Sequence, residues 1–153
     1  MFQSMAGQRL QYLTTNDWVL VQAKAAPRIF KLGEEIIQQG EGVDSIYIIR
    51  RGEASVQLGA SGSRAILAKL GPEDICGEIA FLEKGKATAA VIASDEKVEA
   101  DQLDGQELRS LFAAFPGLAS RFYQSLATIL AERLRLTSRE LAREMMMRDL
   151  HQK

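Results

Sequence analysis

A series of short stretches rich in β-branched and aromatic residues, separated by turns, restricts the fold more than any other feature of the sequence. Glycine marks several turns, including the tight turn at residues 51–52 and the hairpin loop at residues 59–63. Strands this short, with turns at such close intervals, are typical of a small antiparallel sandwich or barrel. We therefore predict a mostly β, α+β fold with strands at residues 28–32, 35–39, 45–50, 54–58, 65–70, 90–93 and 98–103.

The residues before this β region are predicted to be helical. Apolar residues recur at helical intervals within residues 1–26. Thr14 and Asp17 have the spacing of a capping box, so we expect a helix to restart there and to run to about Ala25. Pro27 is predicted to stop it, because proline ends helices.

Two predicted helices follow the β region, a short one at residues 106–115 and a long one at residues 117–150. The long helix carries an apolar stripe of Leu118, Phe122, Leu126, Ile129, Leu130, Leu134, Leu141 and Met145. It would span roughly 45 Å, more than it needs to cover one face of such a domain. We predict that it pairs with a second copy, giving a homodimer; the alternative is that it folds over its own domain. Within a single domain, the predicted parts are an N-terminal helical segment 1–26, a β-roll region 27–104 and C-terminal helices 105–153.

Composition and charge exclude several functional classes. The 153 residues have a net charge of −1, so the chain lacks the excess of positive charge that is typical of proteins that bind nucleic acid or an anionic membrane. Cys76 and His151 are the single cysteine and histidine, so an internal disulfide is excluded and a zinc site or histidine-dependent triad is disfavoured. We see no secretory signal and no membrane-spanning stretch. A lone cysteine, interpreted as a small core residue, suits a reducing compartment, and we expect a cytoplasmic protein.

The segment at residues 76–91 combines a loop, one helical turn, a second loop and the start of a strand. Gly77 would let the backbone approach a ligand closely, and the turn from Glu78 to Leu82 would present free N–H groups at its start. Such a helix start suits an anion. The remaining strands look like a frame around this segment, so we expect its chemistry to decide the function.

The order of glycines and strands resembles the cyclic nucleotide-binding domain. This is the β-roll of catabolite-activator-type regulators, cyclic-nucleotide-dependent kinase regulatory subunits and gated channels. The similarity is carried by residues 30–41 (FKLGEEIIQQGE), 46–52 (IYIIRRG) and 77–82 (GEIAFL), within a match from about residue 8 to about residue 140. Each glycine serves a turn of the roll. The resemblance implies an antiparallel β-roll or jelly roll (double-stranded β-helix) with N-terminal helices and a long C-terminal helix.

The resemblance identifies residues 76–91 as the phosphate-binding cassette of that family. It implies that Gly77 and the helix start take the cyclic phosphate, with Ile79 and Ala80 as cassette backbone. It also implies that Glu78 binds the ribose 2′-hydroxyl. These four residues match the family pattern as they stand in this sequence.

The arginine that pairs with the phosphate in this family is missing. Its place falls on Ala87, with Thr88 and Ala89 at the small positions beside it and the Thr88 hydroxyl available to a phosphate oxygen. A charge-assisted contact contributes roughly 1.5–3 kcal/mol, so its loss lowers affinity by about ten- to a hundredfold. Lys84 and Lys86 offer substitute charges, although lysine lacks the planar fork of arginine. The alternative is that both lysines lie in solvent.

Thr137 and Ser138 on the long helix complete the implied site. The passage at residues 131–138 (AERLRLTS) is similar to the helix segment through which catabolite-activator-type proteins contact the purine, using a threonine and a serine. The alternative is a common solvated helix face.

The resemblance implies a regulatory sensor that binds cyclic AMP, cyclic GMP or a related small ligand and signals through its last helix, without a cofactor. The alternative is a degenerate roll that binds no ligand and acts as a dimerisation or protein-interaction domain. We expect no enzymatic activity, because the sequence shows no nucleophile–base pair, metal cluster or P-loop. We also expect no DNA-binding region, since no helix-turn-helix follows the long helix, and no membrane partner.

Overall fold

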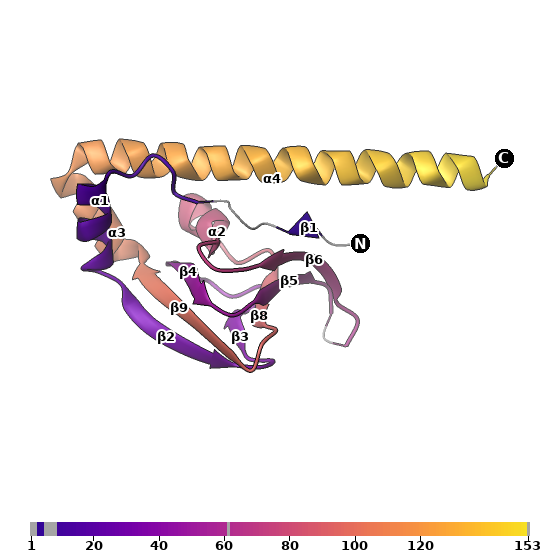
Figure 1. Cartoon of the computed structure of the whole chain (residues 1–153), viewed down its shortest axis with the longest axis horizontal. Helices are drawn as coiled ribbons and strands as arrows, with labels where there is room; N and C mark the ends of the chain where they lie inside the picture. Colours follow the sequence, from indigo (N-terminus) through magenta and orange to yellow (C-terminus); the bar gives the residue numbers. More distant parts are fainter. Residues whose placement is uncertain (1–2, 5–8, 61, 153) are drawn as a thin grey trace.

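The computed structural model describes residues 3–4, 9–60 and 62–152 of the chain. Two β-sheets form a roll, and one long helix runs along it and extends beyond it (Figure 1). The strand order is β1-β6-β5-β8-β3 in one sheet and β2-β9-β4-β7 in the other. The strands are β1 (Gln3–Ser4), β2 (Ala26–Lys31), β3 (Glu35–Ile37), β4 (Ser45–Arg51), β5 (Ala54–Leu58), β6 (Ala65–Leu70), β7 (Ile75–Cys76), β8 (Ala90–Ala93) and β9 (Lys97–Asp104). Apart from β1, which is parallel to β6, the pairs are antiparallel, and the predicted β-roll is confirmed.

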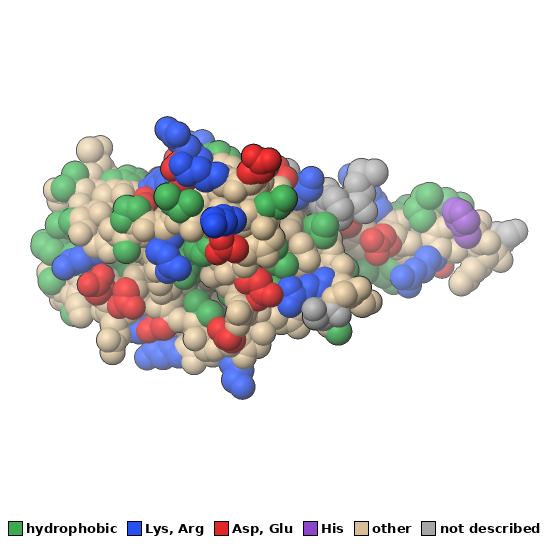
Figure 2. All heavy atoms as spheres, turned by 90° about the horizontal axis from the view of Figure 1, so that it is seen from below, with side chains coloured by type: hydrophobic (Ala, Val, Ile, Leu, Met, Phe, Trp, Pro, Cys, Tyr) green, Lys and Arg blue, Asp and Glu red, His purple; other side chains and the backbone are tan. Residues whose placement is uncertain are grey.

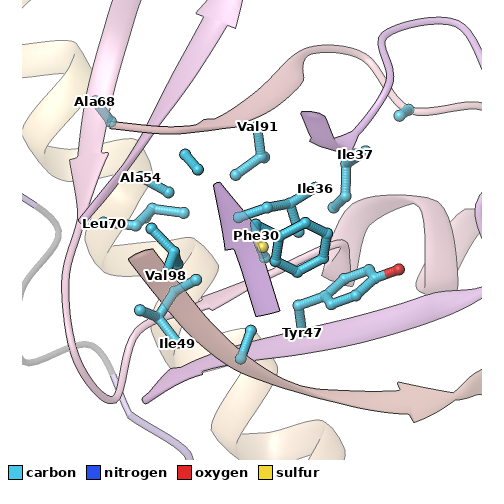
Figure 3. Close-up of a cluster of buried hydrophobic side chains, with 14 residues drawn as sticks. Phe30, Ile36, Ile37, Tyr47, Ile49, Ala54, Ala68, Leu70, Val91 and Val98 are labelled. Atoms are coloured by element: carbon cyan, nitrogen blue, oxygen red, sulfur yellow. The ribbon is translucent and has the colours of Figure 1, made fainter. Parts of the chain in front are cut away.

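Strand β4 shows how the sequence divides the interior into two hydrophobic cores. Its side chains alternate in direction, so Tyr47 and Ile49 belong to the core between the sheets, while Ile46 and Ile48 belong to the core beneath the helices. Figure 3 shows the core between the sheets, where Tyr47 lies edge-on to Phe30 with the ring centroids 6.3 Å apart. Because both faces of β4 are covered, its sequence is a nearly continuous apolar run.

Helix α1 (Thr15–Gln22) begins at the predicted capping box. The Asp17 amide donates to the Thr14 hydroxyl at 3.1 Å, and the Thr14 amide donates to the Asp17 carboxylate at 2.9 Å. The same carboxylate accepts two hydrogen bonds from Arg121 in the C-terminal helix, at 2.6 and 2.8 Å. One buried carboxylate therefore both starts α1 and attaches it to the beginning of α4.

The prediction of helix over residues 1–26 is wrong outside α1. Gln3–Ser4 forms the strand β1, and the residues just before α1 make turns in which the Tyr12 amide donates to Ser125 Oγ at 3.0 Å. Because the Ser125 hydroxyl accepts the hydrogen bond of the Tyr12 amide, that amide does not need a helical carbonyl as its acceptor. Pro27 lies inside β2, which tolerates proline because it is the edge strand of its sheet. The parts of this prediction at residues 1–2 and 5–8 fall outside the described residues.

Helices α3 (Gly105–Ala114) and α4 (Pro116–His151) confirm the two C-terminal helices. Helix α3 lies at one end of the roll and α4 runs along it, as Figure 1 shows, with Leu108 of α3 and Phe122 of α4 fully buried. The rings of Phe112 and Phe122 lie 4.9 Å apart between the two helices. The core beneath the helices also takes in α1 and the outer face of β4.

Helix α4 packs on the roll with its first half only. Of the predicted apolar stripe, the residues up to Ile129 are buried, whereas Leu134, Leu141 and Met145 are exposed. Figure 2 shows the C-terminal end of the helix projecting from the body of the molecule, with hydrophobic side chains near His151. The helix therefore does fold over its own domain, and it still leaves apolar surface beyond it.

The visible face of the roll in Figure 2 carries basic and acidic side chains interspersed with one another. This mixture agrees with a net charge of −1. Within the described part of the chain, no helix is both long enough and apolar enough to cross a membrane.

Candidate ligand-binding site

Gly77 joins β7 to helix α2 (Glu78–Glu83) in a conformation that glycine adopts most readily. Its φ is 88°, and a Cβ atom there would collide with the carbonyl oxygen of Ser45 and lie 3.3 Å from the side chain of Ile37. The two-residue strand β7, which the sequence pattern does not predict, pairs with β4 and holds the chain immediately before Gly77. The chain thus turns sharply out of the sheet into α2, and the close backbone approach expected of Gly77 is made to β4.

A cavity of about 760 Å³ opens between this segment, the β5–β6 hairpin and α4. Its volume lies in the range usual for small-molecule sites. The predicted site residues that line it are Gly77, Glu78, Ile79, Ala80, Ala87, Thr88, Ala89 and Thr137. Ser138 is exposed on α4 and lies outside this lining. The structure therefore brings the cassette and the long helix together across one cavity.

Ala87 presents only a methyl group at the position where the resemblance places an arginine. It is almost fully buried and lines the cavity, and its amide donates to the carbonyl oxygen of Glu41 at 2.9 Å. Lys84, which ends α2 with a φ of 53°, and Lys86 are both exposed and lie outside the lining. The two lysines thus lie in solvent, and neither supplies the missing charge to the cavity.

Glu78 and Arg133 form an ion pair between α2 and α4. The Glu78 side chain is 4% exposed and the Arg133 side chain 17%, and both residues line the cavity. A second nitrogen of the Arg133 guanidinium donates to the carbonyl oxygen of Ile75 at 2.8 Å. One guanidinium on the long helix therefore holds both the strand before the cassette and the carboxylate that begins α2.

The sequence interpretation did not single out Arg133, which falls within the passage 131–138 that it took for either a purine-contacting segment or a solvated helix face. Arg133 precedes Thr137 by four residues, so both lie on one side of α4 and reach the same cavity. That spacing is the signal that could have found it. Arg135 pairs instead with Glu132 on its own helix and is 58% exposed, so the solvated interpretation suits that residue.

The single cysteine is a buried part of the core between the sheets. Burial raises the pKa of the Cys76 thiol, and the neighbouring Glu78 carboxylate raises it further, since both disfavour a thiolate. A neutral, buried thiol has little reactivity. Cys76 is therefore a packing residue.

Aromatic contacts connect α2 to the two C-terminal helices. The Phe81 ring stacks on Tyr123 of α4 at 6.4 Å with an interplanar angle of 15°, and Tyr123 lies edge-on to Phe112 of α3 at 5.3 Å. The Arg109 guanidinium lies 5.4 Å from the centroid of the Phe81 ring and pairs with Asp44. A displacement of α2 would therefore press directly on both helices.

Known proteins are similar to this chain in sequence, with about a third of the aligned residues identical. The family model described as "Cyclic nucleotide-binding domain" matches residues 27–115. Cyclic GMP-binding protein C of Dictyostelium discoideum is 35% identical over 130 residues, covering 80% of this chain and 5% of the relative. A CRP-like cAMP-activated global transcriptional regulator of Mycobacterium tuberculosis is 32% identical over 117 residues, covering 76% of this chain and 50% of the relative. This chain thus spans half or less of the length of these curated relatives.

Solved structures agree with the sequence comparisons. The catabolite activator protein of Thermus thermophilus superimposes with a TM-score of 0.73 at 26% identity, covering 89% of this chain and 62% of that one. A cyclic nucleotide-binding domain from Methylobacillus flagellatus gives a TM-score of 0.80 at 19% identity, over 86% of this chain and 74% of that one, and so supports the fold. The chain belongs to the cyclic nucleotide-binding domain family.

Proposed function

We propose that this chain is a regulatory, non-catalytic, cytoplasmic module that binds a cyclic nucleotide or a related small ligand and reports it through α4. The observation that carries the proposal is the placement of the cavity between the cassette and α4, with the Glu78–Arg133 pair joining its two sides. A ligand in this cavity would touch both elements at once. Ligand occupancy would therefore change the energy of the contact between them.

Cyclic AMP and cyclic GMP are the first ligands to test. The printed names of the relatives include a cyclic GMP-binding protein and a cAMP-activated regulator. The cassette backbone and Glu78 are in place, while Ala87 offers no charge to a phosphate. We expect binding of either nucleotide to be at least about tenfold weaker than with an arginine at this position.

The proposed signal is a shift between two placements of α4. A ligand favours one placement only by the difference in its affinity for the two. Here the contacts that distinguish the placements are the Glu78–Arg133 pair and the stacking of Phe81 on Tyr123, because both join α2 to α4. The exposed second half of α4 would carry the movement to a partner.

We also propose that α4 pairs with α4 of a second copy. Leu134 and Leu141 are one heptad apart, and Met145 follows on the same side, so three exposed side chains form one apolar stripe. The same face of α4 contributes to the cavity lining through Leu134 and Leu141. A second α4 on this stripe would cover the open side of the cavity.

Calorimetric titration with cyclic AMP and cyclic GMP, together with melting temperatures, tests ligand binding. Movement of α4 is measured by the distance between spin labels at Glu83→Cys and Arg143→Cys, since both positions are exposed and the native cysteine is buried. We expect heat at high ligand concentration, a higher melting temperature and a changed label distance. If a ligand binds and the distance distribution stays the same, reporting through α4 is wrong.

The alternative function is a dimerisation or protein-interaction domain without a ligand. Ala87 in place of arginine and the exposed apolar stripe of α4 favour it. It predicts a stable dimer that gives no heat and no thermal shift with millimolar nucleotide. The same titrations therefore separate the two functions.

A further inference from the structure

We infer that the cavity between the cassette and α4 selects a ligand without negative charge, a largely apolar small molecule with few neutral polar groups. The inference rests on the proposed function, in which this cavity is the ligand site. It concerns the class of ligand, for which the cavity lining gives direct evidence.

The lining is predominantly aliphatic on the sides formed by the sheets and the cassette, and α4 adds three leucines among charged and polar residues. The β5–β6 hairpin contributes Val56 and residues 65–68, and α4 contributes Leu130, Leu134 and Leu141. These side chains come from separate elements and face one shared volume. An apolar molecule placed there would lose its contact with water on several sides, which is the main source of affinity for such ligands.

The charges around the cavity oppose an anion. Among the described residues, the lining holds the three carboxylates Glu78, Glu140 and Glu144 and one guanidinium, that of Arg133. That guanidinium is already bound to Glu78 and to the carbonyl oxygen of Ile75. A phosphate entering the cavity would give up its hydration and find a negative formal charge in the lining.

Neutral hydrogen-bonding groups are present where a charged one is missing. The hydroxyls belong to Thr88, next to Ala87 in the cassette, and to Thr137, across the cavity on α4. A hydroxyl both donates and accepts, so the two residues suit carbonyl, hydroxyl or amide groups on a neutral ligand. This arrangement fits an apolar body with a polar group at each end.

Two fluorescent probes that differ in a single charge test the inference. N-phenyl-1-naphthylamine is neutral, and 8-anilinonaphthalene-1-sulfonate is the same skeleton with a sulfonate. We expect the full chain to bind the neutral probe at least tenfold more tightly. Leu67→Asn should abolish this binding, whereas Leu58→Asn should preserve it, because Leu67 (48% exposed) lines the cavity and the similarly exposed Leu58 (43%) does not.

Restoring a positive charge should reverse the preference. Ala87→Arg should bind the sulfonate and cyclic AMP at least tenfold more tightly than the native chain does, and the uncharged Ala87→Gln should not. The Leu67 and Leu58 variants keep the test decisive if Ala87→Arg fails to fold. If the native chain binds the sulfonate or cyclic AMP as tightly as the neutral probe, or more tightly, the inference is wrong. The proposed sensor function would not be affected by that result. If the native chain binds neither probe and no nucleotide, both the inference about the ligand and the proposed ligand-sensing function are wrong.

Discussion

The carboxylate of Glu78, at the start of α2, is held by the guanidinium of Arg133, 55 positions later on α4. The pair spans the cavity wall and joins the two elements that a ligand would touch. Because Glu78 is the residue that the family resemblance assigns to the ribose, a ligand at this carboxylate has to accommodate the cation on α4 as well. In the proposed function, ligand recognition and helix placement would therefore share one contact.

Replacing Arg133 by methionine should destabilise the protein by about 3 kcal/mol, because it leaves the buried Glu78 carboxylate without its cation. Urea unfolding monitored by circular dichroism measures this change. Arg135→Met is the matched control, since Arg135 is largely exposed and pairs within its own helix. Its effect should stay below about 0.5 kcal/mol. Equal losses in the two variants would show that the Glu78–Arg133 pair has no special role.

Neutralising both partners should recover part of that loss. In Glu78→Gln with Arg133→Met, no buried charge is left uncompensated, so the double variant should be more stable than Arg133→Met alone. A double-mutant cycle gives the coupling energy. A coupling energy near zero would contradict the direct contact between the side chains.

Stability should fall in acid through Asp17. The hydrogen bonds and charge of Arg121 hold the pKa of the Asp17 carboxyl well below its ordinary value of 3.8, against the opposing effect of burial. The folded state thus binds the proton less readily than the unfolded state. The stabilisation is complete above the unfolded pKa and is lost as the pH falls from about 5 toward the folded pKa.

Unfolding free energies of the native chain and of Asp17→Asn, measured between pH 7 and pH 3, check this pH dependence. The native chain should be the more stable at pH 7, and the difference should shrink as the pH falls. A difference that is constant over this range would mean that Asp17 does not titrate with a depressed pKa.

Gly77→Ala should cost roughly 2 kcal/mol or more, since alanine strains at a positive φ and its Cβ would collide with the carbonyl oxygen of Ser45. Gly85→Ala is the control on the same segment, because nothing lies within 4 Å of a Cβ there. Thermal unfolding distinguishes them. Similar melting temperatures for the two variants would contradict the close approach at Gly77.

Leu141→Glu should convert a dimer into a monomer, because it places a charge in the apolar stripe of α4. Sedimentation velocity at several concentrations measures the mass. Ala142→Glu, exposed on the neighbouring face of the same helix, should leave the dimer intact. A native chain that sediments as a monomer at all concentrations would rule out the pairing.

Local signals in the sequence predict most of the fold. The strands β5, β6 and β8 begin and end where the residue pattern places them, and Thr14 and Asp17 form the predicted capping box. Each of these depends on residues close in the chain. Strand β1 depends instead on a partner more than sixty positions later, so a local pattern cannot reveal it.

The candidate site also has one part that depends on residues close in the chain and one part that depends on a distant partner. The cassette is recognisable because its glycine and carboxylate are consecutive, and the site residues predicted within it do line the cavity. The spacing of Arg133 and Thr137 indicates that they share a face of α4, but it does not show what that face contacts, and Arg135 has the same residue type in the opposite environment. Only the way α4 lies along the roll decides which of the two arginines faces α2.

The first half of α4 is anchored in the core and the second half is not, so the helix can act as a lever. From Ile129, the last buried residue of the stripe, to its end the helix is about 33 Å long, and a tilt of about 6° would move the tip by about 3.5 Å. That displacement is comparable to the diameter of a water molecule. A change too small to disturb the packing of the aromatic rings would therefore be large enough to break or make a contact with whatever lies at the far end.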